Sequence, residues 1–127
     1  MKDIQDLEDI KTLINAFYDA ATKDALLGPV FNDIAQVDWE HHLPVMYAFW
    51  EFLLLGGKHY TGNPIEKHNA LHRMVPLTNE MFDRWLALFQ ATVDQHFSGS
   101  VADNAKFRAF AISETWKPKF DGPFKTI

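Results

Sequence analysis

Six histidines are the side chains of this sequence best suited to chemistry, and two of them, His68 and His72, stand four residues apart. On a helix this spacing places both imidazoles on one face, where they could bind a metal ion with Glu66 as a third donor. A zinc hydrolase of the H-E-x-x-H type needs a glutamate directly after the first histidine, but Asn69 stands there. The pair therefore permits a metal site but lacks the catalytic base of that enzyme class.

Other catalytic classes lack their sequence patterns. A di-iron bundle repeats the motif E-x-x-H, whereas Glu40 and Glu66 each stand only two residues before a histidine. A Ser-His-Asp hydrolase of the α/β type needs a G-x-S-x-G turn, which is absent from the sequence. The chain has no cysteine, which excludes disulfides, thiolate ligands and covalently attached haem.

A non-covalent haem site requires fewer sequence features than these catalytic sites. It needs one histidine, an apolar cleft and a hydrogen-bond donor on the opposite side. Phe, Trp and Tyr make up 14% of the chain, which fits a large flat ligand, although a well-packed core would also use them. From the residues alone, three interpretations of the protein's function remain open. The chain could be a haem protein, a helical metal-binding protein using His68 and His72, or a haem-free helical interaction module.

Composition limits the partners and the location. The formal net charge of -5 argues against nucleic acid, because phosphate binding needs clustered Lys and Arg. The N-terminal residues are acidic and lack the apolar core of a secretory signal. The longest apolar run, Phe52 to Leu55, is far shorter than a membrane span. We expect a cytoplasmic protein that does not enter the membrane.

Helical periodicity indicates the elements that position these residues. A first helix is predicted from near Asp3 to near Lys23, and its apolar stripe consists of Ile10, Leu13, Ile14, Phe17 and Ala21. Asp38 is a candidate N-cap for a second helix that ends at Gly56-Gly57. Pro44 lies past the first turn of this helix and is expected to bend it.

The second half of the chain predicts one short and two long helices. Pro64 suits the first position of a short helix that reaches about Leu71. Thr78 can cap a long helix that closes at Ser98-Gly99, and Ser100 with Asp103 can cap a last helix that ends near Trp116. Prolines and a glycine indicate an irregular tail over about residues 117–127. Because no segment shows strand alternation, we expect an all-α fold in one domain, residues 1–127.

Five segments together resemble the third group of the truncated haemoglobins, which are bacterial globins. They are Phe17-Tyr18, L-G-P-V-F at 27–31, W-x-x-H at 39–42 followed by Phe49-Trp50, Y-T-G-N-P-I-E-K-H at 60–68, and F-D-R-W-L-A-L-F at 82–89. Their order and spacing extend the resemblance from about residue 7 to residue 116. The resemblance implies a two-over-two helical sandwich around haem b, in which the proximal histidine stands on a very short helix within a loop.

The resemblance also assigns roles on the proximal side. The family carries its proximal histidine in a G-x-P-x-x-x-H segment, and the interval from Pro64 to His68 reproduces it. His68 is therefore the expected iron ligand, and His72 is expected to be a helix-end or loop histidine. Lys67 is expected to lie near a haem propionate.

On the distal side, Tyr18 matches a tyrosine and Trp85 a tryptophan that donate hydrogen bonds to the bound ligand in this family. His42 matches a histidine near the pocket mouth, although a rotation of about 100° would exchange it with His41. The residues expected to line or support the distal wall are Phe31, Met46, Phe49 and Trp50.

These matches imply a function. The resemblance predicts reversible binding of O2, and of NO and CO, at a five-coordinate haem iron. Two hydrogen bonds to the ligand, of about 1 kcal/mol each or more, would slow its release. Slow release suits chemistry on O2, NO or peroxide, or sensing, better than bulk oxygen transport. An NO dioxygenase or peroxidase-like activity would require a reductase, which the sequence does not identify.

Overall fold

The computed structural model describes residues 1–34, 38–57 and 78–120, without the side chains of 33–34 and 118–120. Within these ranges all regular structure is helical, as predicted, and no strand is present. The elements are α1 (Leu7–Lys23), a single π-helical turn η1 (Val30–Ile34), α2 (Trp39–Leu55), α4 (Asn79–His96) and α5 (Ser100–Phe120). The short helix predicted after Pro64 lies outside the described residues.

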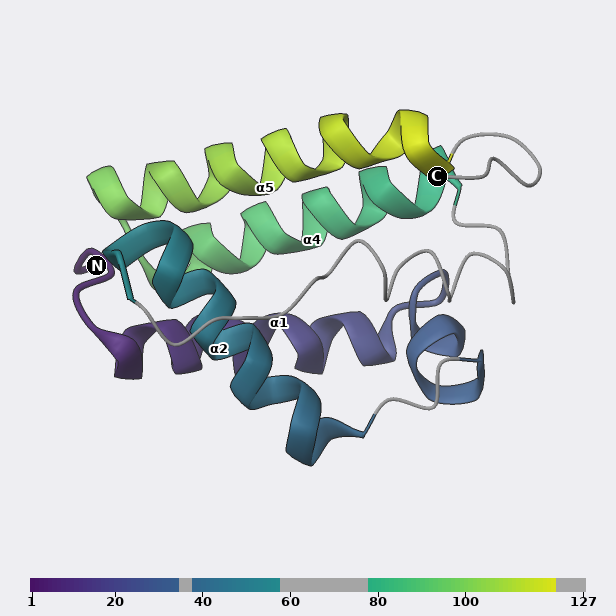
Figure 1. Cartoon of the computed structure of the whole chain (residues 1–127), viewed down its shortest axis with the longest axis horizontal. Helices are drawn as coiled ribbons and strands as arrows, with labels where there is room; N and C mark the ends of the chain where they lie inside the picture. The colour runs from purple at the N-terminus through teal and green to yellow at the C-terminus, as the bar shows by residue number, and fades with distance from the viewer. Residues whose placement is uncertain (35–37, 58–77, 121–127) are drawn as a thin grey trace.

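The four long helices form two pairs (Figure 1). Helices α4 and α5 lie side by side and run in opposite directions, while α2 crosses α1. The pairs also meet each other, because α1 packs against α4 and α2 packs against α5. This arrangement is the predicted two-over-two sandwich.

The core draws buried residues from all four long helices. Every residue of the predicted apolar stripe of α1, from Ile10 to Ala21, is buried. Phe89 and Val93 of α4 pack into the same core. On α5 the fully buried positions carry small side chains, Ala105, Ala109 and Ser113 among them, which lets α5 approach its neighbours closely.

Helix α1 begins later than predicted, and Asp3 has another role. Asp6 is the N-cap of α1, with its side chain accepting a hydrogen bond from the Asp9 N–H at 3.0 Å. The carboxylate of Asp3 instead accepts hydrogen bonds from the N–H groups of Val101 (3.0 Å) and Ala102 (2.8 Å). Asp3 therefore satisfies the first turn of α5, which the sequence had led us to assign to a Ser100–Asp103 capping box.

The other predicted caps are confirmed. Asp38 caps α2 by accepting a hydrogen bond from the Glu40 N–H at 3.2 Å, and Thr78 caps α4 through the Met81 N–H at 3.2 Å. Gly56 ends α2 with φ of 74°, a left-handed conformation that glycine adopts without steric cost. Helix α2 continues through Pro44.

Helix α5 is longer than predicted, since it continues past Pro118 to Phe120 instead of ending near Trp116. Lys117 explains this difference. Its ammonium group forms ion pairs with Asp83 of α4 and with Glu114. The pair with Asp83 fastens the last turns of α5 to α4, and such tertiary anchoring can outweigh the hydrogen bond that a proline removes. In the described ranges, no helix has the length and apolar character needed to cross a membrane.

Candidate functional site

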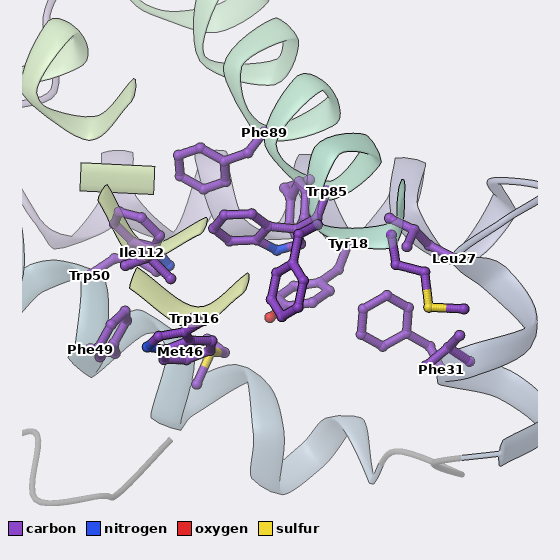
Figure 2. Close-up of a pocket in the computed structure, with 14 residues that line it drawn as sticks. Tyr18, Leu27, Phe31, Met46, Phe49, Trp50, Trp85, Phe89, Ile112 and Trp116 are labelled. Carbon is purple, nitrogen blue, oxygen red and sulfur yellow. The ribbon is translucent and has the colours of Figure 1, made fainter. Parts of the chain in front are cut away.

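A pocket lies among the four long helices and the turn that follows α1. Its cavity volume is about 130 Å³, and the cavity is partly open to solvent. Figure 2 shows Leu27 and Phe31 at one end, Phe49 and Trp50 at the other, and Tyr18 and Trp85 between them. Apolar and aromatic side chains therefore form most of the surface that a ligand would meet.

The residues predicted to form the distal wall come together here. Those that line the pocket are Tyr18, Phe31, Met46, Phe49, Trp50 and Trp85. They come from α1, η1, α2 and α4. His42 is not part of the lining, but it contacts Tyr18 directly.

Tyr18 carries the main polar group of the pocket. Its phenol oxygen lies 3.1 Å from Nε2 of His42, within hydrogen-bond distance. The rings of Phe17, Phe31 and Trp39 pack around it with centroid separations of 5.0, 5.8 and 5.1 Å. Burial among these rings raises the pKa of the Tyr18 phenol above its ordinary value of 10.0, so the phenol is protonated and able to donate at neutral pH.

The choice between the two adjacent histidines follows from the orientation of α2. His42 is half-buried and its ring lies edge-on to that of Tyr18 at 5.2 Å. His41 is exposed, with its Nδ1 atom 3.0 Å from the carboxylate of Asp38. Only His42 of this pair meets the phenol.

Trp85 belongs to a row of stacked rings. Its indole stacks on Phe89 with centroids 5.7 Å apart, and Phe89 stacks on Trp50 at 4.6 Å. Phe17 packs edge-on against Trp85 at 6.1 Å and joins this row to Tyr18. Since Trp50 and Phe89 are buried, the row gives the half-buried Trp85 a rigid support.

Sequence reasoning missed part of the lining. The residues missed are Leu27, Val30, Met81, Phe82, Phe89, Ile112 and Trp116, whereas Phe17, the neighbour of Tyr18 in the matched Phe17-Tyr18 pair, also lines the pocket. Phe82 and Phe89 belong to the matched segment 82–89, but no contact with a ligand was predicted for them. Trp116 stands where the last helix was expected to end, so no signal placed it at a pocket. Trp39 was recognised only as part of a motif, yet it packs against both Tyr18 and His42.

The proximal assignments cannot be placed. His68, Lys67 and His72 all fall in the segment 58–77, outside the described residues. In the parts of the chain that are described, no group of three or more histidine or acidic side chains could hold a metal ion.

Comparisons with known proteins agree with this architecture. The sequence model of the family described as "Bacterial-like globin" matches residues 3–116. The group 3 truncated hemoglobin ctb of Campylobacter jejuni is 36% identical over 90 residues, which cover 68% of each chain. The crystal structure of the group III truncated hemoglobin from Campylobacter jejuni matches with a TM-score of 0.82 and 30% identity, covering 98% of this chain and 100% of that chain. The chain belongs to the bacterial-like globins and, within them, to the group III truncated haemoglobins.

Proposed function

We propose that this haem-binding globin holds haem b in the pocket with His68 as the iron ligand, and that Tyr18 and Trp85 control how it binds O2, NO and CO. Membership of the globin family supports the haem. The pocket residues fit such a group, because flat aromatic rings and aliphatic side chains make up nearly all of the lining. When bound, ferrous haem supplies an iron atom with one coordination position open to a diatomic ligand.

Apolar contacts from Phe31, Met46, Phe49 and Trp50 would hold the macrocycle, with Lys67 near a propionate. With the macrocycle held in place, these side chains would exclude water from the ligand, which strengthens any hydrogen bond formed there. The polar groups would then act on the ligand with little competition from solvent.

The hydrogen bond between Tyr18 and His42 is the observation that carries the proposal. Its donor depends on which imidazole nitrogen holds the proton. With the proton on Nε2, His42 donates to the phenol oxygen, and the phenol hydrogen is free to turn into the pocket. The half-buried indole of Trp85 offers a second N–H donor in the same lining. Donors of this kind stabilise a partly negative ligand and slow its release.

Slow release would make the protein a poor oxygen carrier and suit it to O2, NO or peroxide chemistry, or to sensing. A catalytic cycle as an NO dioxygenase or peroxidase would need electrons from a separate reductase. A cytoplasmic location would give access to such a partner.

The test is O2 dissociation from the haem-loaded protein, measured by stopped flow for Tyr18→Phe and Trp85→Phe. Each variant should release O2 roughly tenfold faster, the equivalent of about 1.4 kcal/mol. Tyr47→Phe is the matched control, because the Tyr47 hydroxyl bonds to Asn15 outside the pocket. Wild-type rates in both pocket variants would contradict the proposed roles. A protein that gives no Soret band with added haemin would contradict haem binding itself.

A further inference from the structure

An ion pair joins the turn after α1 to helix α4 across 60 residues of sequence. Arg84 places Nε at 2.7 Å and Nη2 at 2.6 Å from Oδ1 of Asp24. The other carboxylate oxygen of Asp24 accepts hydrogen bonds from the N–H groups of Leu26 and Leu27, both at 3.0 Å. One carboxylate thus fixes the shape of the turn and binds that turn to α4.

Each partner of this pair is close in sequence to pocket residues. Asp24 holds the backbone of Leu27, which lines the pocket and is followed by Phe31. Arg84 directly precedes Trp85 on α4. Figure 2 shows Leu27 and Phe31 at one end of the pocket and Trp85 in its middle. The ion pair therefore links the turn that carries Leu27 to the helix that carries Trp85, and neither Asp24 nor Arg84 lines the pocket itself.

The burial of Asp24 favours a stable ion pair with Arg84. The Asp24 side chain is only 5% exposed, whereas Arg84 is 50% exposed. Exposed ion pairs usually contribute little, but a carboxylate removed from water depends on its partners. The Arg84 guanidinium is the main reason that the pKa of Asp24 lies below its ordinary value of 3.8. The carboxylate is charged at neutral pH, and Arg84 holds it in a directional contact that apolar packing alone does not provide.

We propose that the Asp24–Arg84 ion pair is a positioning device that sets the spacing between the Leu27 turn and Trp85, and with it the angle at which the Trp85 indole meets a bound ligand. This inference rests on the proposed function of the pocket. Hydrogen bonds weaken steeply as their angle departs from linear. A small displacement of α4 relative to the turn would therefore alter ligand release without removing any residue from the pocket.

The experiment compares Asp24→Asn and Arg84→Met in the haem-loaded protein. Asparagine can still accept from the Leu26 and Leu27 N–H groups, so Asp24→Asn removes the charge while keeping the turn. We expect both variants to change the O2 dissociation rate in the same direction by roughly two- to tenfold, as weakening one hydrogen bond would do. The double variant should add nothing further, because both changes break one interaction. Arg84→Lys, which keeps the charge, should recover most of the wild-type rate.

Lys106→Met is the matched control. It removes a 2.8 Å ion pair between α5 and Asp94 of α4, and neither residue lines the pocket. We expect this control to change thermal stability but to leave the O2 dissociation rate and the C–O stretching frequency of the CO complex at wild-type values. If Asp24→Asn and Arg84→Met behave like the control, the ion pair is only a stabilising contact and the proposal is overturned.

Hydrogen exchange provides a readout that does not depend on ligand chemistry. In Asp24→Asn and Arg84→Met, backbone amides at 30–31 and at 81–85 should both exchange faster, whereas Lys106→Met should affect neither segment. Unchanged exchange at 81–85 would also overturn the proposal. Failure of the proposed function is recognised separately, because Tyr18→Phe and Trp85→Phe would then both leave O2 release unchanged whatever the ion pair does.

Discussion

The imidazole of His42 and the phenol of Tyr18 lie within a hydrogen bond of each other, 3.1 Å apart, although 24 residues separate them in the sequence. The contact joins α2 to α1 at the edge of an aromatic cluster. It makes the direction of the Tyr18 hydroxyl depend on a residue that does not line the pocket.

Replacing His42 by leucine tests this dependence. If the imidazole donates to the phenol oxygen, its loss leaves the phenol hydrogen poorly oriented. We expect His42→Leu to release O2 roughly two- to tenfold faster, and His42→Gln, which can still donate, to lie closer to wild type. The control is His41→Leu, because His41 is exposed and pairs with Asp38. Slower release in His42→Leu would mean that the imidazole instead accepts the phenol hydrogen and competes with the ligand.

The raised pKa of Tyr18 predicts an alkaline loss of stability. Burial keeps the phenol protonated in the folded chain above pH 10.0, the pKa at which it ordinarily ionises. Above that pH the unfolded chain binds fewer protons than the folded one, so the free energy of unfolding falls as pH rises. The slope from this group approaches about 1.4 kcal/mol per pH unit at most. Urea unfolding between pH 9 and 11, a range set around the ordinary tyrosine pKa, should show this slope in wild type and in Tyr47→Phe but not in Tyr18→Phe.

The cap that Asp3 provides to α5 predicts a stability effect from the opposite end of the chain. Asp3→Ala leaves the Val101 and Ala102 N–H groups without this acceptor, and should lower the free energy of unfolding by about 1–2 kcal/mol. Asp103→Ala, an exposed acid in the same first turn, is the control and should cost clearly less. Equal losses in the two variants would show that only the charge near the helix end matters.

Acid should weaken the same contact. Desolvation raises the pKa of Asp3, but hydrogen bonds from the backbone of Val101, Ala102 and Ile4 outweigh it and lower the pKa below 3.8. The hydrogen-bonded carboxylate therefore contributes fully to the free energy of unfolding above the pKa that Asp3 has in the unfolded chain. This contribution is lost as pH falls through the lower pKa that Asp3 has in the folded chain. Urea unfolding from neutral pH to pH 3 should show a smaller acid-induced loss in Asp3→Ala than in wild type.

The iron ligand can be assigned by rescue. We expect His68→Gly to lose the five-coordinate ferrous spectrum and added imidazole to restore it, because a free imidazole can occupy the vacated ligand position. His72→Gly should keep the wild-type spectrum. The reverse result would move the proximal ligand to His72, and loss in both variants would favour a shared metal site.

The fold was largely predictable because its helices follow local rules. The apolar stripe of α1, the caps Asp38 and Thr78 and the stop at Gly56 each depend on neighbours within a few residues. The predictions of helix ends were wrong where a contact between residues far apart in the sequence determines the end. Asp3 can begin a helix as well as Asp6 can, and only the position of α5 shows which one caps α1. The length of α5 likewise depends on the contact of Lys117 with Asp83.

The pocket was predictable in part for a related reason. A motif could mark Tyr18 and Trp85, because their polar atoms have a chemical use beyond packing. Phe89 and Ile112 have the same apolar pattern whether they face a core or a cavity, so periodicity cannot separate the two. The ion pair of Asp24 with Arg84 has no local signal, since surface charges at such a separation usually do not meet.

The cap on α5 also orders events during synthesis. The N–H groups that Asp3 satisfies belong to residues 98 and 99 positions later in the chain. At about 5–20 residues per second, a ribosome makes them some 5–20 seconds after Asp3 itself. Until then the Asp3 carboxylate lacks the two N–H groups that it accepts from in the folded chain, so the contact between the N-terminal segment and α5 forms only after α1, α2 and α4 have been made.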